Sequence, residues 1–210
     1  MNIAVIGSGN VGGTLGRRWA EAGHQVTFGA RNPDNPKLQA VLAQTNHQVR
    51  GASIPEAIAN AEIVVLTTPY EAAKEVLQPA SSFAGKIVLD CTNPIAPGLK
   101  GLTVGLNTSG AEELARLIPE TPVVKSFNTT GWENMANPHY GDHKATMFLC
   151  GDNPEAKQKV IQLIEVLGFE ASDTGSLHMA RYLEPLAMVW IHLARIQGHG
   201  ADIALKLLKR

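Results

Sequence analysis

The chain has 210 residues, of which 44% are apolar and 18% charged, and its formal net charge is −1. This length fits one large domain, or a main domain with a small appendage, and it can bury a core without disulfides or metal. The balanced charge gives no electrostatic case for nucleic acid or an anionic membrane surface as a partner.

No apolar run is long enough to cross a bilayer, and the residues after Met1 lack a signal-peptide pattern. Cys91 and Cys150 lie far apart in apolar runs and match no zinc or redox spacing. We therefore expect two buried thiols in a reducing compartment. Together these features predict a cytoplasmic protein that does not associate with a membrane.

In chain order, short apolar runs alternate with helical patterns. We predict strands at residues 2–6, 24–29, 47–51, 62–69, 86–94, 121–130, 145–151 and 169–175. We predict helices at residues 11–21, 36–45, 53–61, 71–78, 109–118 and 154–167, and loops at 98–105 and 131–143. This alternation is typical of an α/β fold with a mostly parallel sheet and helices on both faces.

We place the main domain at residues 1–174 and a small helical extension at 175–210, broken near Gly198 and Gly200. The extension is rich in Leu, Ile, Ala, Met and Trp. We expect it to pack against the domain or against a second subunit, because so apolar a segment is costly to leave in water.

The pattern G-x-G-x-x-G, formed by Gly7, Gly9 and Gly12, stands between the first predicted strand and helix. In this context Gly7 allows a tight turn, Gly9 lets the backbone approach a pyrophosphate, and Gly12 lets the helix pack on the strand. The phosphates would lie at the amino end of the helix, where free N–H groups favour negative charge. The pattern predicts a dinucleotide-binding loop.

The second predicted strand ends in Ala30, Arg31 and Asn32, with no acid before Asp34. An NAD site usually has Asp or Glu here for the ribose hydroxyls, whereas an NADP site uses arginine for the 2′-phosphate. A guanidinium binds that phosphate through charge-assisted hydrogen bonds. We therefore predict NADPH over NADH.

Three further strand ends carry small, neutral, hydrogen-bonding side chains. They are Thr67, Thr68, Pro69 and Tyr70; Cys91, Thr92, Asn93, Pro94 and Ile95; and Ser126, Phe127, Asn128, Thr129 and Thr130. No strand end offers a Ser–His–acid set, a His–Cys cluster or paired carboxylates. Such a lining suits hydride transfer between two redox cofactors, whose rings carry the chemistry, so we predict no catalytic side chain.

Several titratable residues keep alternative interpretations. Lys125 lies in a predicted strand, where it is either a base or a residue with an ordinary structural or surface role. His178, Arg181 and Glu184 share a helical spacing. They form either an ion pair at the surface or a subunit interface, or one edge of a substrate slot.

His139 and His143 show a His-x3-His spacing, which can bind metal on a helix. Pro138 and Gly141 favour a loop at this place instead. We therefore predict no metal site.

Five stretches together carry a resemblance to known proteins: "IGSGNVGGTLGRRWAEAGHQVTFGARNP", "VVLTTPYEAA", "KSFNTTGWENM", "CGDN" and "DTGSLHMARYLEPLAMVWI". They resemble the NADPH-dependent F-420 reductase family, also called F-420:NADP oxidoreductases, and the cytosolic oxidoreductase domain of six-transmembrane metalloreductases. The resemblance implies a Rossmann-type, doubly wound domain with a small C-terminal extension, assembled as a homodimer. It also implies hydride transfer between NADP(H) and a small-molecule redox acceptor, with F-420, FMN and FAD as candidates.

The resemblance assigns roles to individual residues. Those expected to meet the pyrophosphate are Ser8, Gly9, Asn10 and Val11, and those near the adenosine phosphate are Ala30, Arg31 and Asn32. Those expected around the ribose and nicotinamide are Thr67, Thr68, Pro69 and Tyr70 on one side and Asn93, Pro94 and Ile95 on the other. Those expected to border the second ring are Asn128, Thr129 and Thr130.

Two other functions stay open. One is an imine reductase of the pyrroline-carboxylate type, which would need a proton donor and a carboxylate-binding group. The other is a non-catalytic NADPH-binding sensor or partner protein whose acceptor slot is closed.

Overall fold

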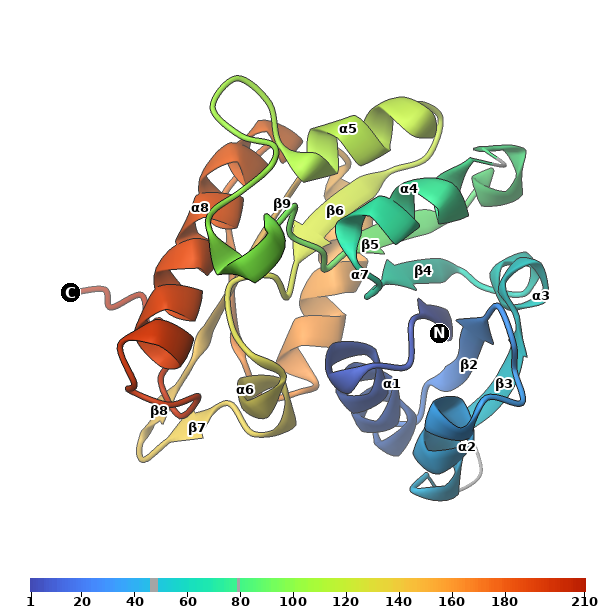
Figure 1. The fold of residues 1–210 in the computed structure, drawn as a ribbon, viewed down its shortest axis with the longest axis horizontal. Helices are drawn as coiled ribbons and strands as arrows, with labels where there is room; N and C mark the ends of the chain where they lie inside the picture. The colour runs from blue at the N-terminus through green and yellow to red at the C-terminus, as the bar shows by residue number, and fades with distance from the viewer. Residues whose placement is uncertain (46–48, 79) are drawn as a thin grey trace.

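A computed structural model describes residues 1–45, 49–78 and 80–210 (Figure 1). Over these residues the main sheet has eight strands, in the order β10-β9-β6-β5-β4-β1-β2-β3. Their bounds are β1 (Asn2–Ile6), β2 (Gln25–Ala30), β3 (Val49–Ser53), β4 (Ile63–Leu66), β5 (Ile87–Asp90), β6 (Val123–Ser126), β9 (Thr146–Gly151) and β10 (Glu170–Asp173). Neighbouring strands run parallel except β9, which is antiparallel to β6.

Helices cover both faces of this sheet. On one face lie α1 (Asn10–Glu21), α2 (Pro36–Ala43) and α7 (Pro154–Glu165). On the other lie α3 (Ile54–Ala59), α4 (Tyr70–Leu77), α5 (Gly110–Leu117) and α8 (Ala180–Ile191). In Figure 1, α8 lies at the opposite end of the molecule from α2 and β3. The predicted α/β class, a doubly wound and mostly parallel sheet, is confirmed.

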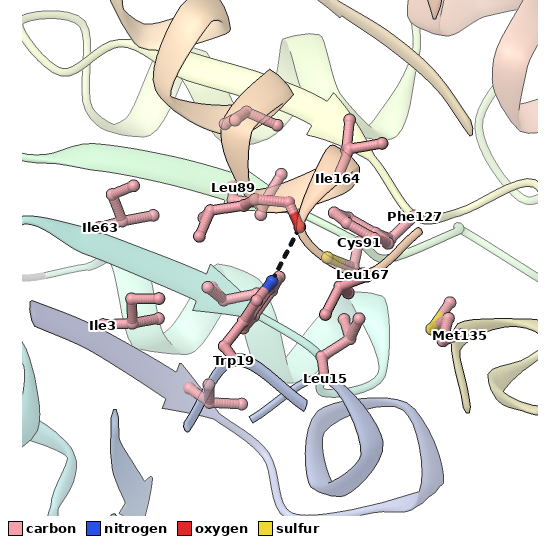
Figure 2. Close-up of a cluster of buried hydrophobic side chains, with 14 of the residues drawn as sticks. Ile3, Leu15, Trp19, Ile63, Leu89, Cys91, Phe127, Met135, Ile164 and Leu167 are labelled. Carbon is pink, nitrogen blue, oxygen red and sulfur yellow. Dashed lines mark hydrogen bonds between the residues drawn. The ribbon is translucent and has the colours of Figure 1, made fainter. Parts of the chain in front are cut away.

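The core has two layers because successive side chains of a strand point to opposite faces of the sheet. On β1, Ile3 faces α1 and α7, whereas Ala4 faces the helices of the other side. Figure 2 shows the first layer, where the indole N–H of Trp19 donates to the Leu163 carbonyl of α7 at 3.0 Å. This hydrogen bond ties α1 to α7 on the same face of the sheet.

Cys91 and Cys150 are free and buried, as the sequence predicted. Cys91 lies in the core layer of Figure 2. Burial raises the pKa of its thiol well above the ordinary value, so the thiol stays protonated and behaves as a small apolar group.

The order of the strands fixes where a ligand would bind. β1 pairs with β2 on one side and with β4 on the other. The chain extends the sheet from β1 to β3 in one direction and from β4 onward in the opposite direction, so the strand order switches between β1 and β4. In open α/β sheets, ligands lie beyond the carboxyl ends of the strands at this point. Here that position is flanked by the residues after β1 and by Thr67 and Thr68 after β4.

Some predictions of local structure are wrong. The predicted loop 131–143 contains α6 (Trp132–Ala136) and strand β7 (His139–Tyr140), which pairs with β8 (His143–Lys144) in a hairpin. A helix of five residues and strands of two residues are too short to show a hydrophobic period. His47 and Gln48, at the start of the predicted strand 47–51, lie outside the described residues.

The C-terminal extension is helical only as far as Ile196, where a π-helical turn ends. Gly198 and Gly200 follow with φ of +79° and +77°, which no helix continues. The remaining chain runs back over the domain, where the Leu205 carbonyl accepts the backbone N–H of Thr146 at 2.9 Å. In the described part of the chain, we find no helix with the length and apolar character that a bilayer span requires.

Candidate functional site

The loop after β1 is shaped by close approaches between backbone segments. Gly7 has a φ of +113°, and a Cβ there would lie 2.9 Å from the Thr67 hydroxyl. A Cβ at Gly12 would lie 1.9 Å from the Gly7 carbonyl oxygen. Thr67 donates its hydroxyl to the carbonyls of Ile6 and Gly7, each at 3.0 Å. Thr67 therefore holds the loop in shape, a role that the sequence did not reveal.

Gly9 opens onto free space instead. In the part of the chain that the structure describes, no atom lies within 4 Å of the position that a Cβ on Gly9 would take. Gly9 is the N-cap of α1, so the next N–H groups, on Asn10 and Val11, have no partner within the helix. The amino end of a helix favours an anion, and the space above Gly9 lets one approach the backbone.

A cleft of about 330 Å³ lies over the carboxyl ends of β1 and β2. It is lined by Ile6, Gly7, Ser8, Gly29, Ala30, Arg31, Asn32, Asn35, Ile54 and Thr68. Arg31 is exposed, and it supplies the only charge among these lining residues. A phosphate on the adenosine ribose would meet a cation here and no carboxylate.

Side chains of the following turn order the residues around Arg31. Asn32 Oδ1 accepts the backbone N–H of Asp34 at 3.0 Å. Asn35 donates its Nδ2 to the Asn32 carbonyl at 2.6 Å, and its Oδ1 caps α2 by accepting the N–H of Leu38 at 3.0 Å. The predicted residues Ala30, Arg31 and Asn32 are thus brought to one wall of the cleft.

The residues after β4 do not all face the cleft. Thr68 lines it, and the buried Thr68 hydroxyl has no hydrogen-bond partner within the described chain. Pro69 is exposed and precedes α4. Tyr70 donates its hydroxyl to Glu113 of α5 at 2.6 Å, and burial, together with this carboxylate, raises the pKa of Tyr70. Thr68 is therefore the member of this group whose hydroxyl has no hydrogen-bond partner within the described chain.

The ends of β5 and β6 are joined by the side chains of Asn93 and Asn128. Asn93 donates its Nδ2 to the Asn128 carbonyl at 2.9 Å. Asn128 donates its Nδ2 to Asn93 Oδ1 at 3.0 Å and to the Leu183 carbonyl of α8 at 3.1 Å. Its Oδ1 is buried and unpartnered within the described chain. Leaving such a buried acceptor without a partner is costly.

Phe127 turns the chain between β6 and Asn128. It has a φ of +58°, uncommon for a bulky residue. Its ring packs edge-on against Trp19 and Phe169, with centroids 5.7 and 6.2 Å away, inside the core layer of Figure 2. This packing holds the strained turn, which releases the chain from the strand just before Asn128.

The remaining predicted residues near the two asparagines contact other parts of the protein. Thr129 is buried, and the Thr130 hydroxyl accepts the Nδ2 of Asn134 on α6 at 2.7 Å. Pro94 accepts the N–H of Thr103 at 2.7 Å through its carbonyl, and Ile95 pairs with a later loop residue. The Thr130 hydroxyl and the Pro94 carbonyl are therefore already hydrogen-bonded within the protein.

Three charged residues lie together beneath this pair, and sequence analysis did not single out one of them, Asp90. Lys125 and Asp90 have fully buried side chains and Glu184 is 1% exposed. The Lys125 Nζ is 2.8 Å from Asp90 Oδ2 and 2.9 Å from Glu184 Oε1. Asp90 and Lys125 are direct partners in the register of β5 and β6. The signal in the sequence that could have revealed this group is a pair of opposite charges in two otherwise apolar strands, Asp90 in β5 and Lys125 in β6.

The predicted set of His178, Arg181 and Glu184 does not act together. Arg181 forms a two-point ion pair with Glu112 of α5, at 2.8 and 2.9 Å, whereas Glu184 is buried. His178 is exposed, with its ring 6.1 Å from that of Tyr182.

His139 and His143 lie on the two strands of the β7–β8 hairpin, not on a helix. Within the ranges that the structure describes, no three His, Cys, Asp or Glu side chains are grouped to hold a metal ion.

Comparison with known families gives one match, to residues 2–94, for the family described as "NADP oxidoreductase coenzyme F420-dependent". This range contains the glycine loop, Arg31 and Asn93. The F420-dependent NADP reductase of Methanothermobacter marburgensis is 30% identical to this chain, over 97% of this chain and 98% of that protein.

Metalloreductase STEAP3 of Rattus norvegicus is 32% identical over 89% of this chain, but the chain spans only 36% of that protein's length. Among solved structures, a candidate F420-dependent NADP reductase from Arthrobacter sp. FB24 matches the whole chain with a TM-score of 0.90 and 32% identity. The match covers 100% of both chains.

Proposed function

Because the chain belongs to the family of F420-dependent NADP reductases, which are NADP-dependent oxidoreductases, we propose that it transfers hydride between NADP(H) and a deazaflavin or flavin. The observation that carries this proposal is the contrast between two parts of one sheet edge. The cationic side chain of Arg31 lies at the carboxyl end of β2, where the phosphate would bind. Neutral amide and hydroxyl groups lie at the carboxyl ends of β4, β5 and β6.

The residues present fit NADP(H). The open space at Gly9 and the free N–H groups at the start of α1 would hold the pyrophosphate. Arg31 would bind the 2′-phosphate with charge-assisted hydrogen bonds, and the unpartnered Thr68 hydroxyl would bind a ribose or amide group. When bound, NADP(H) supplies or takes up the hydride.

The acceptor ring is proposed to lie against Asn93 and Asn128. Asn128 Oδ1 lacks a partner among the described residues, and it would accept an N–H group, which the pyrimidine edge of a deazaflavin or flavin provides. The amide pair carries no charge and moves no proton. Its contribution is to orient the ring and exclude water, and such alignment can be worth about 7–11 kcal/mol of the barrier.

The test is NADPH oxidation assayed with F420, FMN, FAD and pyrroline carboxylate as separate acceptors. We expect turnover with F420 or one of the flavins and none with the imine. Tight NADPH binding without turnover on any acceptor would contradict the proposal and favour a sensor protein. Turnover restricted to pyrroline carboxylate would favour an imine reductase.

We also propose a homodimer that forms through α8 and the π-helical turn after it. Tyr182 and Val189 are 60% and 51% exposed and lie seven residues apart on α8, and Ile196, in the π-helical turn, is 55% exposed. Half-buried Leu186 and Leu193 lie between them at spacings of three and four. This is the apolar pattern by which two helices pack side by side, so a second copy of α8 is the partner that matches it.

A further inference from the structure

Lys125 uses all of its hydrogen-bonding capacity inside the protein. Its ammonium has three N–H donors, and three acceptors surround it: Asp90 Oδ2 at 2.8 Å, the Thr92 carbonyl at 2.5 Å and Glu184 Oε1 at 2.9 Å. Burial lowers the pKa of Lys125, but the two carboxylates outweigh burial and raise it. Lys125 therefore stays charged and out of reach of a substrate, which excludes it as a base.

The first two of these contacts fix the chain on which Asn93 is carried. Asp90 Oδ1 accepts both the backbone N–H and the hydroxyl of Thr92, at 2.9 and 2.7 Å. Lys125 holds the other oxygen of Asp90 and the carbonyl of the same threonine. Three hydrogen bonds, two of them to the backbone, thus hold Thr92, the residue before Asn93.

The third contact fixes the segments around Asn128. Glu184 accepts the backbone N–H groups of Gly110 and Ala111 at 2.9 and 3.0 Å, which ties α8 to the amino end of α5. Leu183, the residue before Glu184, accepts the side-chain N–H of Asn128. Lys125 is therefore bonded to each of the segments that meet at the asparagine pair.

We propose that Lys125 is a positioning residue, which holds Asn93 and Asn128 at the spacing and orientation that a bound ring requires. It acts through Asp90 and Thr92 on one side and through Glu184 and Leu183 on the other. This inference rests on the proposed function, because it assigns the asparagine pair to the ring slot.

The test compares Lys125→Met with Thr92→Val. The first variant removes the ammonium group that binds Asp90, Thr92 and Glu184. The second removes one hydroxyl from the same chain of contacts and leaves every ion pair in place, so it stays informative if Lys125→Met fails to fold.

Two readouts are measured: single-turnover hydride transfer from NADPH to F420 or FMN, and the dissociation constant of NADPH. We expect Lys125→Met to transfer hydride about 100-fold more slowly, the cost of a small misplacement of reacting groups. Thr92→Val should show a smaller loss, and both should bind NADPH as the wild type does.

Lys157→Met is the matched control. Lys157 also binds a carboxylate, Asp173, at 2.8 Å and lies near a backbone carbonyl, but it belongs to α7, not to this network. This variant should transfer hydride at the wild-type rate. A purely structural role for Lys125 would lower its thermal stability and leave hydride transfer in the folded protein unchanged, and that result would overturn the proposal. If Lys125→Met lost NADPH affinity and hydride-transfer rate by the same factor, that result would overturn the proposal as well.

A third readout separates this inference from the proposed function. If the wild type binds NADPH but reduces neither F420 nor FMN, the proposed function fails. The fluorescence spectrum of bound NADPH then still reports the surroundings of its nicotinamide. We expect Lys125→Met or Thr92→Val to shift this spectrum and Lys157→Met to leave it unchanged. Identical spectra for all four proteins would overturn the positioning role.

Discussion

Arg31 is the residue on which the proposed choice between NADPH and NADH depends. We expect Arg31→Ala to weaken NADPH binding by about 10- to 100-fold, the value of hydrogen bonds to a charged group. NADH binding should not change, because NADH has no 2′-phosphate. Measuring both dissociation constants by fluorescence tests this. Arg50→Ala is the control, since Arg50 is an exposed arginine of β3 that binds Thr27. Equal losses for NADPH and NADH would contradict the assignment.

Gly9 and Gly12 should respond differently to the same added methyl group. Gly9 has a φ of −74°, which alanine adopts freely, and open space beside it. Gly9→Ala should therefore keep the wild-type melting temperature but bind NADPH and NADH at least about tenfold more weakly, because the methyl group blocks the phosphates.

Gly12→Ala should lower the melting temperature strongly or prevent folding, since its Cβ would collide with the Gly7 carbonyl. Differential scanning fluorimetry with and without NADPH measures both effects. Wild-type affinity in Gly9→Ala would show that the phosphates do not pass this point.

The link between α5 and α8 gives a prediction about pH. Arg181 binds Glu112 at two points, and this hydrogen-bonded pair lowers the pKa of Glu112 below its ordinary value of 4.5. A carboxyl group whose pKa is lower in the folded state stabilises the fold above its unfolded pKa. That contribution is lost as the pH falls through the lowered value.

We therefore expect the free energy of unfolding to fall less steeply below about pH 5 in Glu112→Gln than in the wild type. Urea denaturation at several pH values measures the slope. Glu165→Gln, at an exposed position on α7, is the control and should follow the wild type. Parallel curves for the wild type and Glu112→Gln would contradict the prediction.

For the whole molecule, the proposed dimer depends on the apolar face of α8. Val189→Arg would place a charge at the centre of that face, where burial of an unpaired cation is costly. We expect the wild type to have twice the mass of one chain by light scattering, and Val189→Arg to have the mass of one. Val166→Arg, an exposed apolar position beyond α7, is the control and should not change the mass. A monomeric wild type would contradict the proposed dimer.

The sequence was sufficient for features that depend on neighbouring residues. The alternation of apolar runs and helical patterns predicts the sheet and most helices, because each element's period is local. Gly7 follows β1 and Arg31 follows β2, the next strand along the chain, so their placement in the lining of one cleft also follows from the sequence. The break after Ile196 is predictable for the same reason, since Gly198 and Gly200 mark it.

Features that depend on distant residues were decided by the tertiary structure alone. The reversal of β9 against β6, and the return of the C-terminal chain to Thr146, have no local signal. Asp90, Lys125 and Glu184 are separated by 35 and 59 positions, yet one ammonium group binds both carboxylates. Charges in apolar segments indicate only that partners must exist, because burial without them is too costly. Which partners meet is fixed when strand pairing and helix packing bring three separate segments together.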